Sequence, residues 1–145
     1  MRVKTCSTPP HGAGPNDERA ALTRDEIEHW ATAYIEAQQG DAIGSDHPLW
    51  WAVENFMDST NCSANDRWEA ILVILNRNPP DTVIGILAAG PLEDLIADHG
   101  ADFIDRIELE ARRNAAFRHL LGGVWRRGGS LEIWHRVQRI RGEVW

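Results

Sequence analysis

Two pairs of residues have the spacing by which one helix can present metal ligands. Glu26 precedes His29 by three residues, and Glu132 precedes His135 in the same way. In some four-helix bundles, two Glu-x-x-His pairs and two further glutamates bind a di-iron or di-manganese centre. The sequence suggests only Glu54 and Glu69 for the two further glutamates, and no complete site follows. A metal-dependent enzyme is therefore the least favoured of three functions, and we predict no metal or other cofactor.

A second group of potential ligands surrounds Gly100. Asp98, His99 and Asp102 place oxygen and nitrogen donors within one turn, a pattern that suits a divalent cation or an acid and base pair. The same residues are typical of a helix end, where charged side chains lie near the helix poles, and we favour this structural interpretation. The sequence shows no phosphate-binding glycine loop, nucleophile elbow or supported Cys/His arrangement, so we predict a protein that is not an enzyme.

Acidic and basic residues are separated along the chain, whose formal net charge is -7. Residues 17–111 contain twenty Asp and Glu against five Arg, whereas residues 112–145 contain eight Arg against two Glu. Oppositely charged surfaces favour binding by electrostatic complementarity, which mainly sets specificity and the rate of encounter. The leading prediction is a non-catalytic protein-binding module with an acidic surface, such as an inhibitor or immunity protein, whose partner is a protein with a basic surface.

The carboxylates that would form this surface recur at three- and four-residue steps along two expected successive helices. Such a row can dock onto a basic protein or imitate a phosphate backbone, although a solvated helix face has the same pattern. An exposed tryptophan beside it would suit a partner or a homodimer contact. The predicted partner-binding residues are Glu93, Asp94, Asp98, Asp102, Asp105, Glu108 and Trp51.

The arginine-rich end supports an alternative function, a nucleic-acid-associated regulator. Arginine close to tryptophan suits nucleic acid, and suits equally a protein interface or pairing with the acidic body of the same chain. The acidic net charge argues against nonspecific nucleic-acid binding by the whole molecule. The residues of this alternative are Arg112, Arg113, Arg126, Arg127, Arg136 and Arg139.

Helix start and stop signals position all of these residues on short helices. Apolar residues recur at helical spacing, and each such run lies between a start signal and a stop signal. The start signals are the capping residues Thr23 with Glu26, Ser63 and Ser130. The glycines expected to end helices include Gly90 and Gly100. We predict an all-α fold, a compact bundle or solenoid-like stack of seven to eight short helices. The pairs Gly122–Gly123 and Gly128–Gly129 are interpreted as turns. The tryptophans predicted to be buried are Trp30, Trp68, Trp125 and Trp134.

The chain length of 145 residues is typical of one domain. Residues 1–20 contain prolines and glycines but few large apolar residues, so we predict a flexible tail there and a single helical domain over residues 21–145. Cys6 and Cys62 form neither a C-x-x-C pair nor a dense framework, which favours reduced cysteines and a cytoplasmic location. The longest apolar runs are too short to span a membrane, so we predict no membrane association.

Four blocks of sequence resemble a family of small bacterial proteins that is known only as a domain of unknown function. The blocks are His47–Glu54, Leu87–Leu95 (LAAGPLEDL), Phe103–Glu110 and Leu120–Trp125 (LLGGVW), and the resemblance spans residues 46–142. It implies a compact helical protein. It assigns no activity, so no functional residue is carried over from the family.

Overall fold

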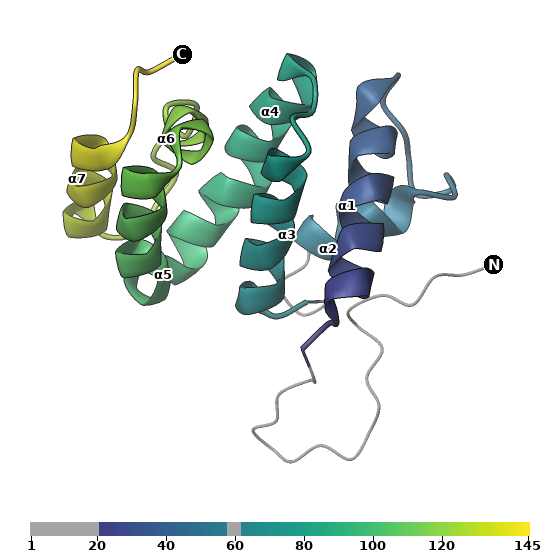
Figure 1. The fold of residues 1–145 in the computed structure, drawn as a ribbon, viewed down its shortest axis with the longest axis horizontal. Coiled ribbons are helices and arrows are strands. Elements are labelled where there is room, and N and C mark those ends of the chain that lie inside the picture. The colour runs from purple at the N-terminus through teal and green to yellow at the C-terminus, as the bar shows by residue number, and fades with distance from the viewer. Residues whose placement is uncertain (1–20, 58–61) are drawn as a thin grey trace. The chain divides into compact units, whose positions relative to one another are not determined.

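The structure, a computed structural model, describes residues 21–57 and 62–145, and every regular element in these ranges is helical (Figure 1). This confirms the all-α prediction. The chain divides into two compact units, one that ends at Asn78 and one that comprises Pro79–Trp145. Residues 1–20, the expected tail, lie outside the described residues, and a single domain over residues 21–145 stays a prediction.

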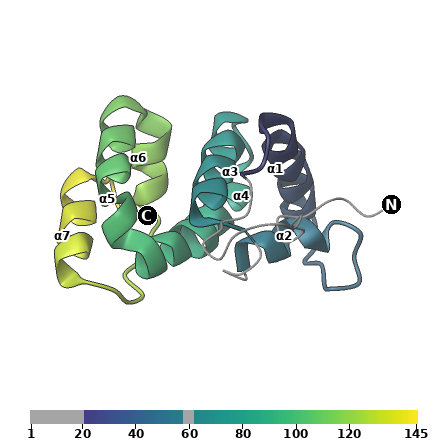
Figure 2. The same ribbon diagram turned by 90° about the horizontal axis from the view of Figure 1, so that it is seen from below.

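The first unit consists of α1 (Arg24–Gln39), α2 (Trp50–Met57) and α3 (Ala64–Asn76). α1 begins with the predicted capping box, in which the Thr23 hydroxyl accepts the Glu26 N–H at 3.1 Å and the Glu26 carboxylate accepts the Thr23 N–H at 2.9 Å. Ser63 caps α3 through its hydroxyl, which accepts the Asp66 N–H. α1 packs beside both other helices, as Figure 2 shows.

Trp30 lies at the centre of the core of this unit. Its side chain is 1% exposed, its indole N–H donates to the Ala52 carbonyl at 2.9 Å, and its ring centroid lies 4.6 Å from that of Phe56. Tyr34 contacts Phe56 edge-on, and burial raises the pKa of its phenol, which stays protonated at physiological pH. Trp68 is also buried, so both tryptophan predictions for this unit are confirmed.

The second unit consists of α4, the π-helical turn η1, and α5 to α7. α5 packs against both α6 and α7 (Figures 1 and 2). Asn114 caps α6 through its side chain, and Ser130 caps α7 as predicted. The bounds are Asp81–Leu87 for α4, Ala88–Leu92 for η1, Glu93–Arg113 for α5, Ala115–Leu121 for α6 and Leu131–Ile140 for α7.

The helical segment from Asp81 to Arg113 continues past Gly90 but kinks beside Gly100, where His99 has the non-helical angles φ -134° and ψ 22°. With α4, η1 and α5 counted as one joined helix, the described residues form six helices, slightly fewer than the seven to eight predicted. At Gly90, the chain continues through η1 because Pro91, which has no N–H to donate, is accommodated by a π turn. Gly100 is buried, and a Cβ there would lie 2.9 Å from the Ile133 side chain, so this glycine allows close packing of α7.

Two tryptophan predictions for the second unit are wrong. Trp125 is 62% exposed. The prediction continued the helical spacing of Phe117, Leu120 and Leu121 to Trp125, but α6 ends at Leu121. Trp134 is half-buried, and the Arg141 guanidinium lies 5.3 Å from its ring centroid. The basic end of the chain thus combines an exposed tryptophan with one covered by arginine.

Cys62 is buried and disulfide-bonded, which differs from the expectation of reduced cysteines. Sequence spacing alone does not determine which thiols meet. The only other cysteine, Cys6, lies outside the described residues. A cytoplasmic location therefore stays a prediction. Within the part of the chain that the structure describes, no helix has both the length and the apolar character to cross a membrane.

Candidate interaction surface

The predicted row of carboxylates lies on α5, but half of it is paired with arginines of the same unit. Asp94 accepts a hydrogen bond from the Arg127 guanidinium at 2.6 Å. Arg136 on α7 donates to Asp105 at 2.8 Å and contacts both carboxylate oxygens of Glu108 at 2.7 and 2.9 Å. These ion pairs hold α7 and the preceding loop against α5, and they reduce the charge available to a partner.

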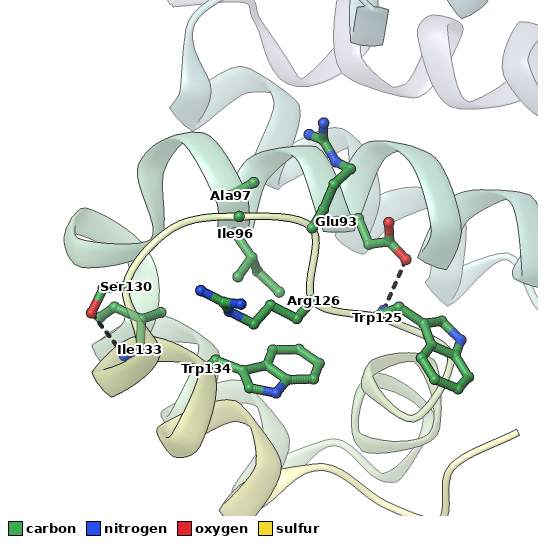
Figure 3. A pocket seen from close by; sticks show the side chains of 10 residues that line it. Glu93, Ile96, Ala97, Trp125, Arg126, Ser130, Ile133 and Trp134 are labelled. Carbon is green, nitrogen blue, oxygen red and sulfur yellow. Dashed lines mark hydrogen bonds between the residues drawn. The ribbon is translucent and has the colours of Figure 1, made fainter.

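A fourth member of the row, Glu93, is buried and has a structural role. Its Oε2 accepts the backbone N–H of Trp125 at 2.8 Å (Figure 3). Together with the ion pair of Arg127, this bond fixes the loop after α6 to the first turn of α5. The hollow in Figure 3 holds about 10 Å³, which is room for about one water molecule and not for a substrate.

The remaining two members, Asp98 and Asp102, face solvent on α5. They are exposed and make no ion pair within residues 21–57 and 62–145. The predicted partner-binding residue outside this row is Trp51. It is half-buried and stacks on His29 with ring centroids 5.4 Å apart. The structure thus leaves two of the six carboxylates of the row without a counter-charge.

The predicted nucleic-acid-binding arginines are likewise divided. Arg113 pairs with Glu110 at 2.9 Å, and Arg127 and Arg136 form the ion pairs described above. Arg112, Arg126 and Arg139 are exposed and form no ion pair in the described part of the chain. Residues 79–145 contain ten Asp and Glu and nine Arg, so the second unit is almost neutral. Three of the six predicted arginines thus pair with acidic residues of the same chain, which was one of the three interpretations of the arginine-rich end.

The ion pairs of Arg136 predict a pH dependence of stability. Hydrogen bonding to Arg136 lowers the pKa of Glu108, and nearby Arg112 and Arg139 act in the same direction. A carboxyl with a depressed folded-state pKa stabilises the fold above its unfolded pKa, about 4.3, and this stabilisation is lost as the pH falls through the folded pKa. We expect Arg136→Met to lower the melting temperature at pH 7 and to lower it progressively less as the pH falls below about 4. A loss that stays the same across this pH range, measured by circular dichroism, would contradict this prediction.

From residue 21 onward, the first unit carries an excess of negative charge that the second unit lacks. Residues 21–78 contain ten Asp and Glu against three Arg. Arg24 and Arg77 both pair with Glu28, at 2.9 and 3.4 Å, and Arg67 is buried. Five exposed carboxylates therefore make no ion pair within the described ranges, namely Asp25, Glu36, Asp41, Asp46 and Glu69. Sequence reasoning missed this surface because it treated residues 17–111 as one acidic body.

Two of these carboxylates border a hollow of about 360 Å³ at the end of α1. Glu36 comes from the last turns of α1, and Asp41 and His47 come from the connection to α2. Apolar side chains, including Ile43 and Leu49, line the rest. A hollow of this size lies at the small end of binding pockets. Apolar walls with carboxylates beside them suit a lysine or arginine side chain, whose stem is apolar and whose head is charged.

The Glu-x-x-His pairs are not arranged as one site in either unit. Glu26 is engaged in the capping box of α1, and His29 stacks on Trp51. Glu132 and His135 lie exposed on α7 in the second unit. In residues 21–57 and 62–145, no group of three or more His, Cys, Asp or Glu side chains is arranged to hold a metal ion.

Comparison with known proteins identifies the family of this chain. A model of a family of unknown function, DUF6869, matches residues 38–144. The chain belongs to this family. The DUF6869 match begins in the last turn of α1 and includes the connection to α2, all of α5 and the arginine-rich end. No curated protein and no solved structure matches the chain. The roles of its residues therefore rest on their geometry.

Proposed function

We propose that the chain is a non-catalytic protein-binding module that binds a basic protein through the acidic surface of its first unit. One observation carries this proposal, namely that the three arginines among the described residues of this unit, 21–57 and 62–78, are used internally. Two of them pair with Glu28, and the third, Arg67, is buried. The exposed carboxylates consequently keep their full charge for an incoming partner.

The hollow beside Glu36 and Asp41 gives this surface a contact point. A lysine or arginine of the partner would extend its stem along the apolar side chains and bring its charge to the two carboxylates. Charge complementarity accelerates encounter and excludes acidic proteins, which is what an inhibitor or immunity protein of a basic toxin or nuclease needs. We propose a role of this kind.

The two alternatives have less support. A nucleic-acid role would need the arginines, and three of the six are bound to carboxylates of the same unit. A metal-dependent reaction would need the Glu-x-x-His pairs, and Glu26 and His29 already have structural contacts.

A charge reversal at the hollow tests the proposal. We expect Glu36→Lys with Asp41→Lys to weaken partner binding by about tenfold or more, because the double change places like charges opposite a basic surface. The partner is first co-purified from the source cells and identified by mass spectrometry. The purified proteins are then titrated by calorimetry at low and high salt, where wild-type binding should weaken as salt increases.

A matched control separates the position of the charges from their number. Asp98→Lys with Asp102→Lys changes the net charge by the same amount on the exposed face of α5. It should leave the dissociation constant nearly unchanged. Equal weakening by both double variants would show that only net charge matters. A partner without a basic surface would contradict the proposal as a whole.

A further inference from the structure

The last four residues of the chain, 142–145, lie extended against the end of α6. We refer to them as the C-terminal segment. The Gly142 N–H donates to the Arg118 carbonyl at 3.0 Å, and the Trp145 N–H donates to the Gly122 carbonyl at 3.2 Å. Carbonyls at the end of a helix lack partners within the helix. The C-terminal segment therefore supplies donors that the end of α6 requires.

Trp145 anchors this segment through its side chain. The indole N–H donates to the His119 carbonyl at 2.8 Å, and the ring stacks on the His119 imidazole with centroids 5.1 Å apart and planes inclined by 16°. The tryptophan is nevertheless 45% exposed. Its contacts are thus specific but shallow.

Gly122 and Gly123, interpreted from sequence as a turn, form the surface on which the segment lies. A Cβ on Gly122 would collide with the backbone oxygen of Glu143, and a Cβ on Gly123 would lie 2.6 Å from the Trp145 ring. The backbone of Gly122 has ordinary helical angles, so close approach and not conformation requires a glycine there. The two glycines and His119 together make a contact surface, referred to below as the groove, on which a peptide backbone and an indole fit closely.

We propose that this groove is a peptide-binding site for an extended segment of a partner protein, in which a glycine is followed three residues later by tryptophan. The chain's own C-terminal segment occupies the groove and defines the chemistry of the ligand. A small first residue is favoured as well, because a Cβ on Gly142 would lie in tight contact, 3.3 Å from the Arg118 carbonyl oxygen. This surface is separate from the acidic surface of the first unit.

A partner segment can replace the C-terminal segment because the C-terminal segment is held by few contacts. Three hydrogen bonds and one stacked pair hold it, and Trp145 remains 45% exposed. Segments held by so few contacts open at far lower free energy than packed helices. Opening exposes the glycines and leaves the carbonyls of Arg118 and Gly122 without these donors. A partner segment of the same chemistry restores every contact, and its apparent affinity is reduced by the fraction of time for which the chain's own segment fills the groove.

The test uses the full chain with Trp145→Ala and a dye-labelled peptide that has the sequence of residues 141–145. By fluorescence anisotropy, we expect saturable binding that is about tenfold or more tighter to the variant than to wild type, because the variant's own segment has lost its anchor. A variant with unchanged circular dichroism that does not bind the peptide would overturn the proposal.

Two controls identify the groove as the binding site. Adding Gly123→Ala to the Trp145→Ala chain should abolish peptide binding, since the new methyl group occupies the place of the indole. A peptide with alanine in place of tryptophan should not bind. If the Trp145→Ala chain instead takes up only the segment of a wild-type copy, seen as a mixed dimer in light scattering without peptide binding, the groove serves exchange between copies and a partner segment is excluded.

Discussion

Replacing Trp30 by alanine should lower the free energy of unfolding of the first unit by about 3–5 kcal/mol, the usual range for a buried tryptophan. Its side chain is 1% exposed and packs on Phe56, so the change leaves a cavity that three short helices cannot close. It also removes the donor to the Ala52 carbonyl, which stays buried without that bond. Urea unfolding followed by circular dichroism measures the loss.

Two further variants separate the contributions of Trp30. Trp30→Phe keeps an aromatic ring but removes the indole N–H, so it should cost less than alanine. Met57→Ala in the neighbouring helix α2 changes a residue that is 63% exposed, and it should alter stability by less than about 0.5 kcal/mol. A Trp30→Ala chain as stable as wild type would show that the core of the first unit lies elsewhere.

Phe117→Ala should destabilise the second unit by a similar amount, about 3–5 kcal/mol. Phe117 is fully buried on α6, a helix of seven residues that packs against α4, η1 and α5. So short a helix depends on tertiary packing rather than on its own propensity. Leu109→Ala, at a position that is 51% exposed on α5, is the matched control and should have little effect.

The two alanine variants together test the number of domains. If residues 21–145 are a single domain, as the sequence predicts, Trp30→Ala and Phe117→Ala lower the midpoint of one common transition. If the two compact units unfold separately, each variant shifts a transition of its own and leaves the other in place. The second outcome would show that the sequence-based domain count is wrong.

Features set by neighbouring residues could be predicted from the sequence. The capping box of Thr23 and the caps of Ser63 and Ser130 depend on contacts within three residues, and all three are present. Trp30 and Trp68 were correctly placed in the core because their helices are long enough for the apolar period to be read.

Features set by distant residues could not be predicted. Gly100 is typical of a helix end, and α5 does kink beside it at His99, but the need for a residue without a side chain depends on Ile133, more than thirty residues further along the chain. The charge of the α5 row depends on Arg136, which reaches Asp105 and Glu108 only because α7 packs on α5. The C-terminal segment belongs to the same class, since nothing local relates Trp145 to Gly123.

The π turn η1 affects how relatives of different length should be aligned. A π turn is an α-helix with one additional residue, and each residue of an α-helix rotates the next by about 100°. The wider π turn rotates less per residue and so absorbs the additional one, and a relative that lacks one residue between Ala88 and Leu92 would form a regular α-helix with α5 in nearly the same orientation. The side chain in the place of Glu93 would then still reach the backbone of Trp125. We expect single-residue gaps in alignments of the family at this point, with the carboxylate directly after Leu92 kept.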